Sequence, residues 1–568
     1  MISLLSWIET FILSNITVLP IAIGLLMAPV MLFLRNKPKA QKVMAVIAST
    51  TLLVIAAILF WVVYKNGIQV YDIGEFGKYG IVLVGDMLSA LMVLLTAFIG
   101  LLVMIYSFDY IEKKSLSMSY YPLYYLMMAG IFGIFLTGDL FNLFVFFEIM
   151  FLSSTGLIMA NEALSVTDTA HKLEATYKYM ALGMIGSFMM LVAIVTIYAT
   201  VGSLNMADLS AKIQMIAETG SIPWVIIAAA LLFIVVFGNK AALVPLHFWL
   251  PDVHPTAPTP ISAMLSGILI KVGAYCILRV LFLILYPTQA FFLPILMFFS
   301  LLTIAVGAIS AMGQTDIKRV LAYSSVSQIG YVLLGLSLGT VGAIAAAIMY
   351  LVNHALAKSM LFLTAGGIIH ETHTRDLRKM GGLITILPLF SMAFLIGTMS
   401  IAGFPPMGGF VSKFALFQSA VSGEFWLPLL IAVLMAVITI FYMFRTWIAV
   451  FWGENKGSLK EAEDGVTDVP MLEGENAAAE SAAVSTAESA QAEQAQAAMQ
   501  TATHATVSAP VKKHKISFEI AFPIAALCAA VILLGIFPEP LYEISNIIAT
   551  QILDPTEYIT AVLGGAPR

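Results

Sequence analysis

Six ionisable residues lie within long apolar stretches of this chain: Glu148, Lys240, Lys271, His354, Lys358 and Lys413. A charged side chain at the centre of a bilayer costs about 3 kcal/mol on insertion scales, so helix packing alone gives no reason for one. Burial disfavours the charged form of a carboxylate or an ammonium, and pairing the two favours it. A Glu–Lys pair that forms and separates would therefore bind and release protons, so these residues predict a proton path.

The local sequence assigns these residues to particular elements. Glu148 lies near the middle of TGDLFNLFVFFEIMFLSSTG, which is long enough to span a bilayer. His354 and Lys358 are four residues apart and share one helix face. Lys240 in FGNKAALVP and Lys413 after SIAGFPPMGGF adjoin Gly and Pro residues that interrupt a helix. Two interrupted helices, each with a lysine at the break, are typical of transporters built from inverted repeats.

A static role is the alternative, in which each charge ties two helices together and the protein is a structural membrane subunit. Five basic groups and a glutamate spread over five apolar segments favour transport instead. Arg279 and Arg445 lie toward segment ends, where we expect their side chains to extend to the membrane interface. Asp86 and Asp139 also lie near segment ends, and we expect them to cap helices.

Composition places the chain among helical membrane proteins. Of its 568 residues, 60% are hydrophobic and 11% are charged, and the mean hydropathy is +0.96. So few charges could not cover the surface of a soluble protein of this length. Cys276 and Cys528 both lie in apolar segments, which predicts two buried hydrophobic residues rather than a disulfide or a metal site.

The chain has no phosphate-binding glycine loop, no dinucleotide fingerprint and no cysteine set for an iron–sulfur cluster. His247 with His254, and His370 with His373, are expected in loops and caps rather than as metal ligands. We therefore expect no cofactor, no metal and no enzymatic reaction.

Apolar segments of about 20 residues predict an all-α polytopic membrane fold with about fourteen transmembrane helices. The predicted spans are 14–34, 43–64, 80–106, 121–137, 139–160, 179–201, 222–245, 258–285, 287–311, 320–338, 341–369, 383–421, 425–452 and 517–537. The span at 383–421 is broken, and residues 204–221 predict an interfacial helix. Residues 454–509, rich in Ala, Glu, Gln, Ser and Thr, predict a disordered cytoplasmic loop.

Basic residues in the connections predict the orientation. With both termini outside, eighteen Lys and Arg residues fall in inside connections and four fall outside. The inside set comprises Arg35, Lys37, Lys39, Lys42, Lys113, Lys114, Lys172, Lys178, Lys318, Arg319, Arg375, Arg378, Lys379, Lys456, Lys460, Lys512, Lys513 and Lys515. The outside set comprises Lys65, Lys78, Lys212 and Arg568.

Five segments carry a family resemblance: TGDLFNLFVFFE, KAALVPLHFWLPDVHPTAPTPISAMLSGILIKVGAY, DIKRVLAYSSVSQIGYVLLG, NHALAKSMLFL and GFPPMGGFVSKF. With them the chain resembles the antiporter-like subunits shared by respiratory complex I and the Mrp-type multisubunit cation/proton antiporters. The form TGDLFNLFVFFE looks most like the D-type subunits of Mrp antiporters. The 454–509 insertion departs from the family's compact pattern and has no assigned role.

The resemblance implies two inverted five-helix repeats, each with a broken helix. The chain would then divide into N-terminal helices (1–120), a first repeat (121–285), a second repeat (286–452), the loop (453–516) and a C-terminal helix with its tail (517–568). The resemblance also implies that Glu148 and Lys240 form the main pair of the first half-channel. Lys271, His354, Lys358 and Lys413 would continue a central hydrophilic axis.

The function that this implies is a proton-translocating subunit of a Na⁺/H⁺ antiporter in a bacterial plasma membrane. It would work within a hetero-oligomer of several Mrp-type membrane subunits. The alternative is a proton-pumping subunit of complex I or of a membrane-bound hydrogenase, where a redox arm drives the same axis. Co-purifying flavin or iron–sulfur subunits would favour the alternative, and small Mrp-like membrane subunits would favour the antiporter.

Overall fold

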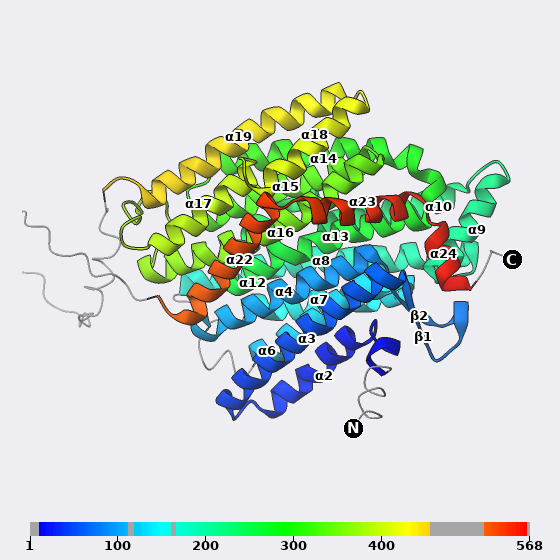
Figure 1. Cartoon of the computed structure of the whole chain (residues 1–568), viewed down its shortest axis with the longest axis horizontal. Coiled ribbons are helices and arrows are strands. Elements are labelled where there is room, and N and C mark those ends of the chain that lie inside the picture. The colour runs from blue at the N-terminus through cyan, green and yellow to red at the C-terminus, as the bar shows by residue number, and fades with distance from the viewer. Residues whose placement is uncertain (1–10, 112–118, 161–165, 455–515, 565–568) are drawn as a thin grey trace, which may run out of the picture.

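The structure is a computed structural model in which residues 11–111, 119–160, 166–454 and 516–564 are described. Long helices lie side by side with similar tilt, and the C-terminal segment crosses them on one face (Figure 1). Helices suit such an apolar chain because they satisfy every backbone polar group within the segment. The predicted loop at 453–516 falls almost wholly outside the described residues.

The N-terminal part contains a small β-hairpin that an all-α prediction missed. The strands β1 (Gln69–Ile73) and β2 (Ile81–Gly85) pair antiparallel. The span predicted at 80–106 therefore begins as a strand, because IVLVG is rich in β-branched residues and Asp86 starts the next helix. The helices here are α2 (Leu19–Phe33), α3 (Pro38–Asn66), the 3₁₀ turn η1 (Gly77–Tyr79) and α4 (Met87–Tyr110).

The middle part contains the first predicted break. Its helices are α6 (Tyr121–Leu136), α7 (Leu140–Ile158), α8 (Val166–Val201), α9 (Met206–Glu218), α10 (Trp224–Lys240), η3 (Leu246–Phe248) and α11 (Trp249–Thr256). A continuous run follows: α12 (Thr259–Met264), η4 (Leu265–Leu269), α13 (Ile270–Leu278) and η5 (Arg279–Ile284), in which η4 and η5 are π-helical. Lys240 is the last residue of α10, directly before the break.

The following part contains the second break. After the 3₁₀ turn η6 (Tyr286–Thr288) its helices are α14 (Gln289–Met312), α15 (Ile317–Ser337), α16 (Val341–Thr372), α17 (Pro388–Ala402), α18 (Gly408–Ser422) and α19 (Trp426–Phe451). The predicted broken span at 383–421 is thus the pair α17 and α18. Lys413 lies in the second turn of α18 rather than in the break itself.

The C-terminal tail is helical, which the sequence prediction did not include. After α22 (Phe518–Ile536), α23 (Glu539–Leu553) and α24 (Thr556–Leu563) follow. α23 packs across α16 on one face of the bundle, and α24 reaches α9 and the hairpin (Figure 1). A tail packed along the bundle holds together helices that are far apart in sequence.

Ten helices among the described residues are long and apolar enough to cross a membrane, which makes this a multi-pass membrane protein. Four shorter apolar helices accompany them: α2, α6, α10 and α17. The run Thr259–Ile284 is buried along its whole apolar window, whereas only 28% of that window is buried in α19. The bundle therefore has an inner group of helices that are shielded by an outer group.

Gly273 on α13 allows the inner group to pack against the first break. A Cβ atom at this position would lie 2.5 Å from the backbone nitrogen of Ala241 and from the backbone oxygen of Phe237. Gly273→Ala should lower the free energy of unfolding by about 1–3 kcal/mol, because two backbones must separate. Thermal denaturation of the purified complex measures this. Gly186→Ala in α8 is the control, since its nearest neighbour would be 3.5 Å away; equal melting temperatures for both variants would contradict the prediction.

Candidate functional site

The five basic residues predicted for the site are all buried. The exposed fraction is at most 4% for Lys240, Lys271, His354, Lys358 and Lys413. Three of them lie on the shielded run Thr259–Ile284 and on α16. The structure therefore gathers the basic side chains on and around the inner helices, away from the apolar outer surface.

Lys271 and Lys358 both donate hydrogen bonds to backbone carbonyls. Lys271 Nζ donates to the carbonyl of Ser266, which lies in the π-helical turn η4. Lys358 Nζ donates to the carbonyl of Leu321 on α15 at 3.1 Å. The hydroxyls of Ser266 and Ser325 form a hydrogen bond of 2.7 Å, which joins η4 to α15. Among the described residues neither ammonium has a carboxylate within ion-pair distance, so neither charge is neutralised.

Lys413 extends its side chain from α18 to the second break. Its Nζ donates to the carbonyl of Ile401 at 2.8 Å and lies over the rings of Tyr331 and Tyr350, at 4.7 and 5.4 Å from their centroids. A helix would use the Ile401 carbonyl to bind the N–H of residue 405, but Pro405 has none. The lysine head group therefore donates a hydrogen bond to a carbonyl that the break leaves without a backbone partner.

His354 lies between the lysines and has no hydrogen-bond partner in the described structure. Both its ring nitrogens are buried, and the ring stacks on Tyr350 at 6.0 Å. It is within electrostatic reach of Lys271, Lys358 and Lys413.

Tyr350 links this region to a buried polar network. Its hydroxyl donates to the amide oxygen of Gln328, and the Gln328 amide group lies 3.4–3.5 Å from the hydroxyls of Thr439 and Tyr442. Tyr442 in turn donates to Ser324 at 3.0 Å. These residues connect α15, α16 and α19 beside Lys413.

Lys240 lies in an aromatic cage at the end of α10. Its Nζ is 5.3, 4.7 and 4.7 Å from the ring centroids of Phe147, Phe151 and Tyr179. It also donates a hydrogen bond to the hydroxyl of Tyr179 at 2.9 Å. Aromatic rings stabilise a cation through their quadrupole, by up to about 2 kcal/mol when it is desolvated. The cage therefore offsets part of the cost of burying the Lys240 head group.

Glu148 lies on α7 beside this cage, but it is only partly buried. Its carboxylate accepts a hydrogen bond from the hydroxyl of Ser187 on α8. No ion pair within 4 Å joins Glu148 to Lys240 in the part of the chain that the structure describes, because each group has another partner on α8. The pair implied by the resemblance is thus not formed in this structure, and its role in transport stays a prediction.

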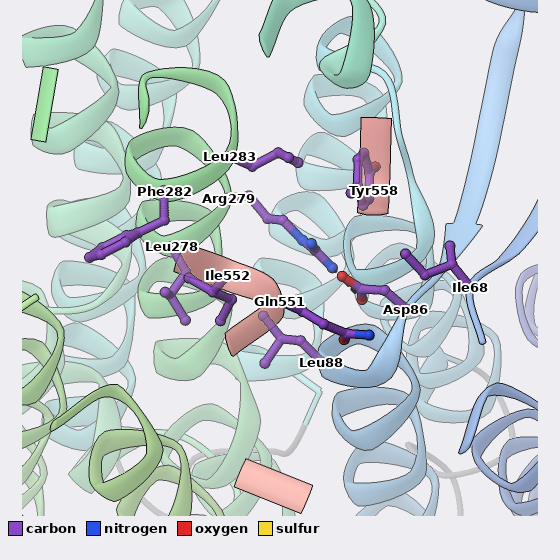
Figure 2. Close-up of a pocket in the computed structure, with 10 residues that line it drawn as sticks. All are labelled: Ile68, Asp86, Leu88, Leu278, Arg279, Phe282, Leu283, Gln551, Ile552 and Tyr558. Atoms are coloured by element: carbon purple, nitrogen blue, oxygen red, sulfur yellow. Dashed lines mark hydrogen bonds and ion pairs between the residues drawn. The ribbon is translucent and has the colours of Figure 1, made fainter. Parts of the chain in front are cut away.

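Arg279 is buried in the bundle, where it pairs with an acidic residue. It forms a buried ion pair with Asp86 at 2.5 Å, and its Nε donates to the hydroxyl of Tyr275 at 2.9 Å. Asp86 also caps α4, as predicted. Figure 2 shows the two side chains pointing toward each other beneath Tyr558 of α24, in a small cavity that Gln551 also lines.

The Asp86 carboxylate is held in its charged form. Burial acts to raise the pKa of Asp86, but the Arg279 guanidinium and the hydrogen bonds from Ser89 together lower the pKa below its ordinary value. Asp139 caps α7 as predicted, and Arg445 donates to the carbonyls of Met312 and Gln314 at the end of α14. These groups are structural ties between segments of the chain.

Two further residues are more deeply buried than predicted. Lys318, which the sequence placed in a basic loop, is 4% exposed, and its Nζ donates to the carbonyl of Ala257 at 3.1 Å. His254, predicted as a loop or cap residue, is fully buried in α11, where it stacks on Phe362 at 4.6 Å. Lys318 is buried because α15 begins earlier than predicted, and His254 is buried because α11 packs inward. The periodicity of the sequence indicates neither feature.

A cleft of about 410 Å³ lies outside α11 and is lined by charged residues. Asp252 on α11 accepts from Lys178 of α8 at 2.9 Å and from Arg319 of α15 at 3.1 Å. Arg375 donates to the carbonyl of Pro255 at 2.7 Å. The cleft is lined by Asp252 and Pro255 of α11, which flank His254 in sequence.

Sequence reasoning missed the neutral members of the site. Tyr179, Ser187, Gln328 and Tyr350 contact the ionisable groups or link them. Tyrosine, serine and glutamine occur throughout apolar segments, so the sequence carries no signal that would have identified these four.

The Asp86–Arg279 pair gives a stability prediction. Asp86→Ala should lower the free energy of unfolding by about 3–5 kcal/mol, because it leaves the Arg279 guanidinium buried without a partner. Asp86→Leu combined with Arg279→Met should recover most of that loss, since it removes both charges. Detergent thermal denaturation of the assembled complex compares the two. A double variant no more stable than the single one would show that the pair is not the source of the loss.

Comparison with known proteins places the chain in a family. The profile described as NADH:quinone oxidoreductase/Mrp antiporter, transmembrane, matches residues 137–439, and that described as NADH-ubiquinone oxidoreductase (complex I), chain 5 N-terminus, matches residues 76–121. The chain is 34% identical to the D-type subunit of the Na⁺/H⁺ antiporter from Alkalihalophilus pseudofirmus, over 97% of this chain and 100% of the relative. It is 36% identical to the corresponding D-type antiporter subunit from Bacillus subtilis, over 79% of this chain and 89% of the relative.

A solved structure agrees with these relatives. A chain of the Mrp complex from Dietzia sp. superposes with a TM-score of 0.81 at 29% identity, over 97% of this chain and 99% of that chain. The chain therefore belongs to the family of D-type Na⁺/H⁺ antiporter subunits, within the membrane proteins shared by Mrp antiporters and NADH:quinone oxidoreductases.

Proposed function

We propose that this chain is the proton-translocating subunit of a multisubunit Na⁺/H⁺ antiporter. The observation that carries the proposal is the set of five buried basic side chains from Lys240 to Lys413, none neutralised by a carboxylate among the described residues. A buried charge without a counter-charge costs several kcal/mol, so such charges inside a membrane protein indicate a functional role. The antiporter relatives support exchange of protons against a monovalent cation.

In the proposed cycle, a proton is exchanged between Glu148 and Lys240 as the pair forms and separates. When the two groups meet, each favours the charged form of the other. When they separate, Lys240 releases its proton toward Lys271. His354 and Lys358 pass it on to Lys413 beside the second break.

The proposed architecture consists of two inverted five-helix repeats. The first occupies residues 121–285 with its break between α10 and α11, and the second occupies 286–452 with its break between α17 and α18. The residues before them (1–120) and after them (453–516 and 517–568) would brace the repeats. The presence of a break with a buried lysine in each half supports this division.

The proposed setting is a bacterial plasma membrane, within a hetero-oligomer of other Mrp-type membrane subunits. The relatives are subunits by name, and the similar solved chain is part of a complex. A proton-pumping subunit of complex I or of a hydrogenase remains the alternative, and the antiporter names of the relatives favour the first. Identifying the proteins that co-purify with this chain distinguishes the two.

Glu148→Gln should abolish antiport while leaving the complex assembled, because the amide cannot bind and release a proton as the carboxylate does. The measurement is cation-driven proton movement in everted membrane vesicles, with assembly checked by co-purification. Glu218→Gln, at the exposed end of α9, is the matched control and should retain wild-type rates. Wild-type antiport in an assembled Glu148→Gln complex would refute the proposed role.

The proposed orientation places Lys379 inside and Lys65 outside. In a chain with Cys276 and Cys528 replaced by Ala, Lys65→Cys should react with a membrane-impermeant maleimide in intact cells. Lys379→Cys should react only after the membrane is opened. Both positions are exposed on the protein surface, so the side of the membrane on which each lies decides whether it is labelled. The reverse pattern would invert the proposed topology.

A further inference from the structure

α8 contacts both members of the Glu148–Lys240 pair at separate points. Tyr179 binds the ammonium of Lys240, and Ser187 binds the carboxylate of Glu148. The two α8 residues are eight positions apart, which corresponds to about 12 Å along a helix. We propose that α8 holds the pair apart in this structure, with Tyr179 as a positioning residue for Lys240; this rests on the proposed function.

The hydrogen bonds around Tyr179 run in one direction. Ser154 uses its single hydroxyl proton to donate to the carbonyl of Phe151 at 2.9 Å. We assign the proton of its 2.8 Å contact with Tyr179 to the tyrosine, because the serine hydroxyl has only one proton to donate. With its own proton used, the Tyr179 oxygen can only accept from Lys240. The hydrogen bonds therefore run in order from Lys240 to Tyr179, from Tyr179 to Ser154 and from Ser154 to the carbonyl of Phe151.

This direction makes the contact a holding point and not a route for protons. A series that ends on a backbone carbonyl has no acceptor that could take up a proton and pass it on. The Tyr179 ring is itself packed on Trp249 at 5.0 Å and on Phe151 at 5.4 Å, so its hydroxyl cannot follow a moving lysine. Tyr179 therefore holds Lys240 in a position where it forms no ion pair with Glu148.

Glu148 is held by a separate residue of the same helix, Ser187. Ser187 lies on the face of α8 next to α7 and is buried, whereas Glu148 itself is only partly buried. The carboxylate accepts one bond from Ser187. Pairing with Lys240 would exchange this bond and the Tyr179 bond for one charge–charge contact, so the two α8 hydroxyls set the balance between the separated and the paired state.

Tyr179→Phe removes the acceptor but keeps the ring that faces the ammonium. Losing one hydrogen bond to a charged group shifts the balance about tenfold toward the paired state. We expect the maximal antiport rate of the assembled complex to fall about tenfold while the KM for the cation stays unchanged. A structure of the variant should show Lys240 Nζ within 4 Å of the Glu148 carboxylate. Tyr177→Phe on the same helix is the control, because its side chain is 67% exposed and faces outward.

A Lys240 side chain that stays in its cage in the Tyr179→Phe structure, with an unchanged antiport rate, would overturn the proposal. If that variant does not assemble, Ser187→Ala tests the other α8 contact, since it removes the hydrogen bond that holds the Glu148 carboxylate. An unmoved carboxylate and an unchanged rate in Ser187→Ala would also overturn the proposal. The position of Lys240 is read from a structure and not from transport. Failure of antiport in the wild-type complex would therefore refute the proposed function, whereas the positioning role of Tyr179 would still be decided by the structure of the variant.

Discussion

The constraint on which this structure depends is that a buried ammonium needs acceptors where nearly every backbone carbonyl is already used. A continuous helix satisfies its own carbonyls, so it has none to offer. The fold meets the requirement by interrupting helices. Pro405 leaves the Ile401 carbonyl free for Lys413, and the π-helical turn η4 presents the Ser266 carbonyl to Lys271. The breaks are therefore the means by which charge is kept inside an apolar bundle.

Aromatic rings and hydroxyls supply what the breaks cannot. Lys240 has three rings and one phenol around it, and Lys413 has two rings. Neither kind of contact neutralises the charge as a carboxylate would. Groups held in this way can change protonation or position at modest cost, because each contact contributes about 1–3 kcal/mol. A proton path requires such moderate and reversible interactions.

The Asp86–Arg279 pair shows the opposite arrangement in the same molecule. Its charges are matched at 2.5 Å, supported by Ser89 and Tyr275, and covered by Tyr558. A matched buried pair resists any change in either partner, because removing one charge leaves the other stranded. The chain thus separates charges that hold helices together from charges that are left without a counter-ion. This distinction depends on the contacts of each group and not on its residue type.

The sequence by itself determined the membrane class, most helix positions, both interrupted helices and the six ionisable residues, because hydropathy and Gly/Pro interruptions are local signals. It did not reveal the β-hairpin, the helical tail, the ion pair of Arg279 or the burial of Lys318 and His254. Those depend on which elements pack together. The tertiary structure alone decided that Glu148 and Lys240 contact α8 rather than each other, because the positions of Tyr179 and Ser187 follow from helix packing that no local pattern encodes.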